Sequence, residues 1–176
     1  MKKRRQTGSR QGKDNARLPG MNIRRATIED AAALAEFNMK MALETEAIEL
    51  IPGVITAGVE TMINDPAMGF YLVVEDGGAI QASLMITTEW SDWRNGLFWW
   101  VQSVYVNQQY RRQGLYRKLY EQVKTLAEAE KNVCGFRLYV EHDNYIAQET
   151  YRSLNMEETS YKLFEELKAD SRYLKT

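Results

Sequence analysis

The chain has 176 residues, of which 44% are hydrophobic and 27% charged, and its formal net charge at pH 7 is −1. This length and apolar content predict one globular domain with at most a small appendage, and exclude global disorder, collagen-like repeats and a pure coiled coil. A single cysteine excludes an intrachain disulfide, a single histidine argues against a zinc site, and no apolar run approaches the roughly 18–20 residues that span a bilayer, so we expect a cytoplasmic protein without a metal.

The first 20 residues differ in composition from the rest of the chain. They hold seven Lys or Arg and one acidic residue, a net charge of +6, whereas the remainder carries −7. With almost no apolar side chains, this part cannot offset its ordering entropy by burial. We therefore expect residues 1–20 to form a basic, flexible tail and residues 21–170 to form the domain. A basic tail can contact nucleic acid, but a solvated arm is the simpler interpretation, so a nucleic-acid partner is not expected.

The first part of the domain predicts one strand and two helices. Residues 22–26 read as a short strand, and residues 31–46 place apolar side chains at helical spacing. Pro52 is expected to break the chain before a second helix over residues 56–64.

Three strands are expected next. Residues 70–75 and 79–88 are apolar and alternating, and Gly77-Gly78 between them indicates a hairpin turn. After a polar loop, residues 97–106 predict a long aromatic strand.

The last part alternates helices and strands. Helices are expected over residues 115–131 and 145–154, and strands over 135–141 and 159–165. The strand–helix–strand unit must give a parallel pair through a right-handed crossover, whereas the hairpin gives antiparallel pairs. The order predicts an α/β (α+β) fold with a mixed central sheet of about six to seven strands, flanked by about four helices.

The segment after the aromatic strand favours phosphate binding. A loop of basic and small residues runs directly into a helix, whose first backbone N–H groups are unpaired and carry the positive end of the helix dipole. Gly114 lets an anion approach the main chain, and Arg111 and Arg112 add positive charge. A solvated basic loop before an ordinary helix is the alternative interpretation.

Two motifs resemble one known family. Residues 111–116 are similar to the acyl-CoA signature Gln/Arg-x-x-Gly-x-Gly/Ala, matching at Arg111 and Gly114 and departing at Tyr116. A second family segment, Leu-x-Val-x-x-x-Asn-x-x-Ala-x-x-x-Tyr-x-x-x-Gly-Phe, is matched from residue 138 onward, with Asn155-Met156 in place of Gly-Phe. On these matches the chain is identified as a member of the GCN5-related N-acetyltransferases, the GNAT superfamily.

The resemblance implies the GNAT acyl-CoA N-acyltransferase fold and direct transfer of an acetyl group from acetyl-CoA to an amine, without a covalent acyl-enzyme. It implies that main-chain N–H groups of the aromatic strand bind the pantetheine arm and polarise the thioester carbonyl, while amides of the following loop hold the pyrophosphate. The cofactor-binding residues expected from it are Val104, Val106, Arg111, Arg112, Gln113, Gly114, Leu115, Tyr116 and Asn144.

Tyr151 matches the position of the family's usual general acid, which returns a proton to the departing thiolate. A phenol with a pKa near 10 is protonated at pH 7, as an acid must be. Aromatic packing between helix and sheet is the alternative role. Asn144 caps the last helix in either case.

The general base is left open. Glu89 and Glu141 lie near strand ends, and each also reads as an ordinary surface carboxylate. The acceptor, a primary amine of a small molecule or peptide, is expected at a site made by the first two helices, the loop after Glu89 and the aromatic strand. The acidic residues Glu44, Glu46 and Glu49 would suit a cationic amine, although solvated helix faces explain them equally well.

Two further expectations concern partners and alternatives. The resemblance implies a homodimer. A non-catalytic acyl-CoA-binding or sensing domain of the same fold is the alternative function.

Along the aromatic strand, neighbouring residues face opposite ways, so Trp99 and Trp100 cannot both line one cavity.

Overall fold

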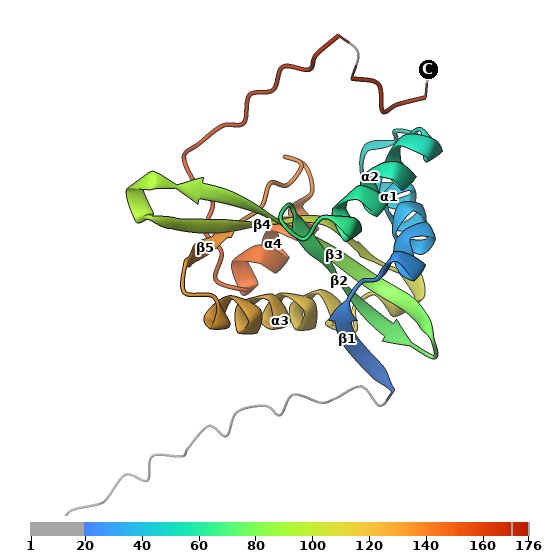
Figure 1. The fold of residues 1–176 in the computed structure, drawn as a ribbon, viewed down its shortest axis with the longest axis horizontal. Coiled ribbons are helices and arrows are strands. Elements are labelled where there is room, and N and C mark those ends of the chain that lie inside the picture. Colours follow the sequence, from blue (N-terminus) through green and yellow to red (C-terminus); the bar gives the residue numbers. More distant parts are fainter. Residues whose placement is uncertain (1–19, 170, 176) are drawn as a thin grey trace, which may run out of the picture.

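The computed structural model describes residues 20–169 and 171–175. Five strands form one sheet in the order β1-β2-β3-β4-β5, in which only the β4–β5 pair is parallel (Figure 1). The strands are β1 (Met21–Arg25), β2 (Gly69–Asp76), β3 (Ala79–Ser91), β4 (Gly96–Val106) and β5 (Val133–Arg137). The helices are α1 (Ala31–Glu46), α2 (Pro52–Asn64), α3 (Leu115–Ala129) and α4 (Tyr145–Ser153).

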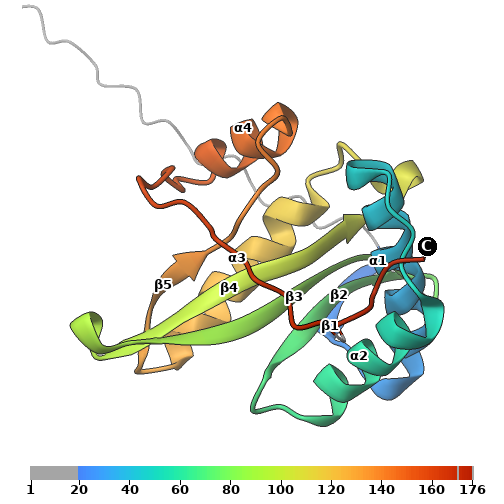
Figure 2. The same cartoon turned by 90° about the horizontal axis from the view of Figure 1, so that it is seen from above.

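Two hydrophobic cores lie on opposite faces of the sheet. On one face α1 and α2 pack against buried side chains that include Tyr71 and Val73. On the other face α3 packs against Leu72, Leu84 and Ile86. Adjacent strand residues such as Tyr71 and Leu72 serve different cores because side chains alternate along a strand. The expected mixed sheet covered by helices on both faces is confirmed (Figure 2).

The expected elements differ from the observed ones at three places. Helix α2 begins at Pro52 because proline fits the first helical position, where its missing N–H is not needed. β5 ends at Arg137 rather than at residue 141. The strand expected over residues 159–165 is wrong, since these residues are extended but pair with no strand of the described sheet. The sheet therefore has five strands rather than six to seven.

Two further expectations concern the basic N-terminal tail and membrane-spanning helices. Residues 1–19 of the expected basic tail lie outside the described residues. Among the described helices, none is long and apolar enough to cross a membrane.

A charged cluster ties β1 to the start of α1. The Asp30 carboxylate accepts two hydrogen bonds from the Arg24 guanidinium, at 2.6 and 2.9 Å, and one from the Thr27 N–H at 2.8 Å. Arg24 also donates to Glu75 on β2 at 2.6 Å. The bonds from Arg24 hold the pKa of Asp30 below its usual value of 3.8, although burial opposes this. Asp30 is buried, so its partners decide whether its charge is tolerated.

We expect Asp30→Asn to lower the free energy of unfolding by about 1–3 kcal/mol, because a charged acceptor of three hydrogen bonds is lost. The pKa of Asp30 is lowered in the folded state, so its contribution is complete above the unfolded pKa and is lost as pH falls through the folded pKa. Urea unfolding of both proteins at neutral and acid pH measures this. Glu36→Gln, which breaks the exposed Glu36–Lys40 pair, is the control and should cost less than about 0.5 kcal/mol. Equal effects of the two variants would contradict the role of Asp30.

Candidate active site

Strand β4 contains a bulge at its middle. Met85 pairs with Gln102 and Ser83 with Tyr105, so β4 has one more residue than β3 between these pairs. Within the extra stretch, Ser103 has a positive φ of 48°. A bulge of this kind bends the strand and shifts the alternation of its side chains. Consistent with this shift, Trp99 and Val101 before the bulge contact the same core as Val104 and Val106 after it.

Polar groups from the α1 side support the bulge. The buried Tyr71 hydroxyl interacts with Ser103 and with Asn38 of α1. Asn38 in turn donates to the Leu34 carbonyl at 2.9 Å. A left-handed non-glycine residue costs of order 1–3 kcal/mol and persists only where its surroundings hold it. These contacts hold Ser103 in that conformation.

Beyond the bulge, β4 is open on one side. The parallel pairing with β5 covers only the stretch from Leu97 to Trp100, so among the described strands the rest of β4 pairs only with β3. The Asn107 N–H donates to the Gln81 carbonyl on the β3 side at 2.8 Å. Because N–H groups alternate along a strand, the N–H groups of Val104 and Val106 face the open side. These are the two strand residues for which the family resemblance implies cofactor binding.

The loop after β4 ends in an exposed set of helix amides. Arg112 and Gly114 have positive φ angles of 63° and 76°. Gly114 is the N-cap of α3 and has no side chain to bond the first turn. The first helical bond runs from the Lys118 N–H to the Gly114 carbonyl at 3.1 Å, so the amides before Lys118 have no helical partner. Together with the helix dipole, they form a site suited to an anion.

Arg111 is paired within the protein instead of standing free over the loop. Its guanidinium bonds Glu44 of α1 at 2.5 Å and the Val106 carbonyl at 2.9 Å. Glu44 also accepts from the Tyr105 hydroxyl at 3.1 Å and from Gln108 at 3.2 Å. Burial works to raise the pKa of Glu44, but these donors outweigh it and hold the pKa below 4.5. Arg111 thus fixes the loop to α1 and β4, although both Arg111 and Arg112 are exposed.

The two tyrosines of the predicted site lie against each other. The rings of Tyr116 and Tyr151 meet edge to face, with centroids 5.7 Å apart, and Tyr116 also stacks on Tyr120 at 6.2 Å. The Tyr116 side chain therefore lies in the α3–α4 packing and not in the loop. Burial raises the pKa of Tyr151 above its usual 10.0 and raises that of Tyr116 as well, so both phenols are protonated at neutral pH. The Tyr116 hydroxyl is buried without a hydrogen-bond partner among the described residues.

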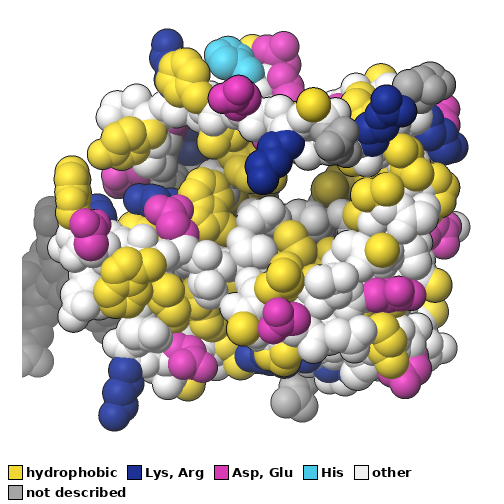
Figure 3. Space-filling view, turned by 45° about the horizontal axis from the view of Figure 1, so that its top comes forward, with side chains coloured by type: hydrophobic (Ala, Val, Ile, Leu, Met, Phe, Trp, Pro, Cys, Tyr) yellow, Lys and Arg dark blue, Asp and Glu magenta, His cyan; other side chains and the backbone are white. Residues whose placement is uncertain are grey.

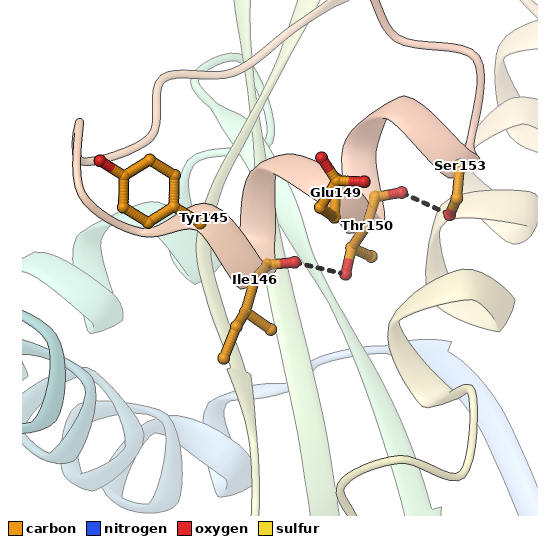
Figure 4. A pocket seen from close by; sticks show the side chains of 5 residues that line it. All are labelled: Tyr145, Ile146, Glu149, Thr150 and Ser153. Carbon is orange, nitrogen blue, oxygen red and sulfur yellow. Dashed lines mark hydrogen bonds between the residues drawn. The ribbon is translucent and has the colours of Figure 1, made fainter.

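One face of helix α4, which carries both polar and apolar side chains, lines an open hollow. Its N-cap, Asn144, accepts a bond from the Ala147 N–H at 3.1 Å. Figure 4 shows the five side chains that line the hollow, with the hydroxyls of Thr150 and Ser153 turned to carbonyls of the helix. These residues are Tyr145, Ile146, Glu149, Thr150 and Ser153. Arg117 of α3 bonds Ser153 at 3.2 Å and so links the two helices.

Both carboxylates considered as a general base are engaged. Glu89 accepts from the Trp100 indole at 2.5 Å and from Arg137 at 2.6 Å. Glu141 accepts from the Asp143 N–H at 2.8 Å. Trp99 is buried, whereas Trp100 is directed to Glu89 on the other face, as alternation requires. Among the described residues, no group of three or more His, Cys, Asp or Glu side chains could hold a metal ion.

Two features of this site were not predicted. The first is the bulge at Ser103, for which the run Val101 to Val106 gives no signal, since serine is not a usual left-handed residue. The second is the joining of Glu44 to Arg111, residues that are 67 positions apart in the sequence. The opposite charges of Glu44 and Arg111 are evident in the sequence, but no local sequence pattern indicates that the two side chains form a pair.

A model of the acetyltransferase (GNAT) family matches residues 35–156. The chain belongs to this family. The resemblance found in its motifs is thereby confirmed. A possible acetyltransferase from Clostridium difficile 630 is 43% identical, with a TM-score of 0.78 over 84% of this chain and 97% of that one. No curated protein matches the chain.

More distant GNAT structures share the fold. A predicted acetyltransferase from Clostridium acetobutylicum, solved with acetyl-CoA, is 18% identical, with a TM-score of 0.70 over 83% of this chain and 96% of that one. A ribosomal-protein-alanine N-acetyltransferase from Brucella melitensis biovar Abortus 2308 is 14% identical, with a TM-score of 0.66 over 84% of this chain and 98% of that one. At these identities the likeness shows the fold alone.

We expect Gly114→Ala to destabilise this GNAT domain by about 1–2 kcal/mol, because a side chain disfavours the positive φ of 76°. A Cβ there would meet no atom within 4 Å, so the effect isolates backbone conformation. Gly58→Ala in α2 is the matched control, since Gly58 also has open space around it but lies in an exposed helix, where alanine should stabilise by about 0.5–1 kcal/mol. Thermal unfolding compares the two. Equal stabilisation by both would show that the loop does not need a left-handed residue at 114.

Proposed function

We propose that this chain transfers an acetyl group from acetyl-CoA directly to a primary amine of a small molecule or peptide. The observation that carries the proposal is the open side of β4, where the N–H groups of Val104 and Val106 have no strand partner among the described residues. This open edge continues into the amides at the start of α3. A strand edge followed by an anion site suits a ligand with an amide-containing arm and a pyrophosphate.

The residues present fit acetyl-CoA. The amides from Arg112 to Tyr116 hold the pyrophosphate, and Gly114 leaves the main chain accessible because no side chain covers it. Tyr116, the departure from the family pattern, packs against Tyr120 and Tyr151, so its ring does not stand in the loop. When bound, acetyl-CoA supplies the acetyl group as a thioester. The C. acetobutylicum structure of the same fold contains acetyl-CoA, which supports this choice.

Direct transfer agrees with the position of the single thiol. Cys134 is exposed on β5, in the stretch that pairs with Leu97 and Phe98, at the other end of β4 from Val104. A covalent route would need a nucleophile beside the thioester, with an activating base. In the direct route the amine nitrogen attacks the acetyl carbonyl, the carbon–sulfur bond breaks, and the nitrogen loses a proton while the sulfur gains one.

Tyr151 is the proposed donor of that proton. It lies on α4, its ring contacts Tyr116 from the anion-binding turn of α3, and its raised pKa keeps it protonated at neutral pH. Its side chain is half-buried, and burial is the cause of its raised pKa. A protonated phenol beside the anion-binding turn supports the proposal that Tyr151 acts as the general acid.

The acceptor is proposed at the sheet face that α1 and α2 leave open. Gln102 of β4 lies on this face and donates to Thr87 at 2.6 Å. Two of the acidic residues that would attract a cationic amine are paired internally, Glu44 with Arg111 and Glu49 with Lys175. Acidic and basic side chains are interspersed on the surface seen in Figure 3. Recognition of the amine therefore depends on shape and neutral hydrogen bonds more than on net charge.

We expect Tyr151→Phe to lower kcat about 10–100-fold, in the range of acid–base catalysis, with the KM for acetyl-CoA unchanged. The pKa of Tyr151 is raised above 10.0, so the alkaline loss of activity in the parent should have its midpoint above pH 10 and should be absent from the variant. Steady-state kinetics across pH measures both. Tyr120→Phe is the control, because it removes a hydroxyl from the same aromatic cluster without touching the proposed acid. Full activity of Tyr151→Phe would remove this residue from the mechanism.

The proposed activity is tested by release of CoA thiol from acetyl-CoA with a panel of polyamines, amino acids, aminoglycosides and short peptides, against a reaction without acceptor. We expect turnover with one chemical class of primary amine. Isothermal titration of acetyl-CoA accompanies the panel. Binding of acetyl-CoA without turnover on any amine would favour a sensing domain of the same fold, and absence of binding would overturn the assignment of the β4 edge and the α3 amides.

A further inference from the structure

The β3–β4 hairpin carries a charged and aromatic patch on the sheet face that α1 and α2 leave open. Figures 1 and 2 show that β3 and β4 extend beyond these two helices. Trp99 contacts the α3-side core, so its neighbours Phe98 and Trp100 lie on the opposite face. Directly paired residues share a face, which adds Glu89, the partner of Phe98, and Arg137, the partner of Trp100.

The ring of Phe98 lies at the base of this patch. It packs against β5 at Gly135, where a Cβ would come within 2.8 Å of a ring carbon, so a side chain at this position would displace the ring. The guanidinium carbon of Arg137 lies 3.8 Å from the ring centroid, and that of Arg94 lies 5.1 Å from it. Phe98 is only 8% exposed. Two guanidinium groups therefore meet over one aromatic ring, a favourable place for a cation.

The patch has an excess of positive charge and of hydrogen-bond donors. Both oxygens of Glu89 are used, one by the Trp100 indole at 2.5 Å and one by Nη1 of Arg137 at 2.6 Å. The other nitrogens of Arg137 have no hydrogen-bond acceptor among the described residues, and the exposed Arg94 has neither a hydrogen bond nor an ion pair there. Asp92, the next acidic residue along the hairpin, accepts from a main-chain N–H at 2.9 Å. Two guanidinium groups and one carboxylate leave the patch a charge of +1.

The patch lies close to the proposed site of transfer. Arg137 is the last residue of β5, at the point where β4 and β5 part. Its partner Trp100 is four residues before Val104 on β4, which corresponds to about 13 Å at the rise of a strand. Gln102 lies between them on the same open face. A single small molecule or short peptide can therefore contact the patch with one end and the acetyl group with the other.

We propose that the acceptor amine carries an anionic group, a carboxylate or a phosphate, and that Arg137 binds this group with Arg94 beside it. The inference rests on the proposed acetyl transfer at the open side of β4. A guanidinium binds carboxylate or phosphate oxygens through paired hydrogen bonds. Stacking on Phe98 fixes the plane of the Arg137 guanidinium and Glu89 holds one of its nitrogens, so the remaining N–H groups are oriented for the ligand. The patch thus selects the end of the acceptor that is not acetylated.

The first test compares acceptors that differ only in the anionic group. The probes are ω-amino carboxylates with their neutral amides, and ω-aminoalkyl phosphates with the corresponding alcohols, assayed by release of CoA thiol. We expect kcat/KM to be about 10–100-fold higher for at least one anion than for its neutral partner, because a hydrogen bond to a charged group is gained. The group with the larger preference identifies the anion. Equal kcat/KM within every pair would overturn the proposal.

Arg137→Gln is expected to abolish this preference, mainly by raising the KM for the anionic acceptor, with the KM for acetyl-CoA unchanged. Glu89→Gln keeps an acceptor for the Trp100 indole but removes the competing negative charge, so it should strengthen the preference. Arg94→Gln should weaken it in the same direction as Arg137→Gln. The Arg94 side chain is exposed and makes no hydrogen bond among the described residues, so this variant decides the question if Arg137→Gln lowers the Tm.

Arg25→Gln is the matched control. The Arg25 guanidinium also lies over a phenylalanine ring, 4.1 Å from the centroid of Phe70, but it belongs to β1 at the other edge of the sheet. Its removal should leave the preference for anionic acceptors unchanged. A preference that survives both Arg137→Gln and Arg94→Gln, or one that is lost equally in Arg25→Gln, would overturn the assignment of the patch.

Isothermal titration of the same probes into the protein with CoA bound separates this inference from the proposed function. Turnover of neutral and anionic amines at equal rates would overturn the anion site and leave acetyl transfer intact. Binding of an anionic probe that depends on Arg137, without release of CoA thiol from acetyl-CoA, would support the site and overturn the transfer. Neither binding nor turnover of any anionic probe would overturn the anion site.

Discussion

The parting of β4 from β5 is the constraint on which the rest of this molecule depends. A regular parallel pair would satisfy both edges of β4 along its whole length and leave nothing for a ligand. The bulge at Ser103 and the early end of β5 at Arg137 prevent this, and they leave main-chain donors exposed in the middle of a folded sheet. Such donors are normally paired, so their availability is a specific feature of the fold. The left-handed Ser103 costs conformational energy, which the buried Tyr71 and Asn38 offset through their contacts.

Much of the fold followed from local patterns. Period-two alternation in β3 and the Gly77-Gly78 turn gave the hairpin, and the glycine before Leu115 gave the start of α3. The start of α2 was missed because Pro52 was interpreted as a break, although the same residue fits the first turn of a helix. The strand at 159–165 was expected from its own composition. Strand formation also needs an edge to pair with, and a single sequence does not say whether that edge belongs to the same chain.

The parts of the site that depend on main-chain geometry and on a local motif could be predicted from the sequence. The ion pairs between residues far apart in the sequence could not. Gly114 has a positive φ and directly precedes α3, so the turn and the start of the helix were predictable from the sequence. The charges behaved differently. Arg111 is bound to Glu44, Glu89 to Arg137 and Glu49 to Lys175, so side chains that looked available in the sequence are used within the protein. These pairs join residues at least 48 positions apart, a separation at which residue spacing carries no information.

The carboxylate of Glu44 has a consequence for the way the two halves of the domain communicate. It bonds Arg111, Tyr105 and Gln108, and so joins the last turn of α1 to the end of β4 and to the loop before α3. Linkage is reciprocal: a ligand that draws Arg111 toward an anion on the loop must weaken the hold on α1, and a ligand that displaces α1 must change the affinity of the loop. Through the Glu44 side chain, the binding of a ligand at the loop before α3 is coupled to the binding of a ligand at α1.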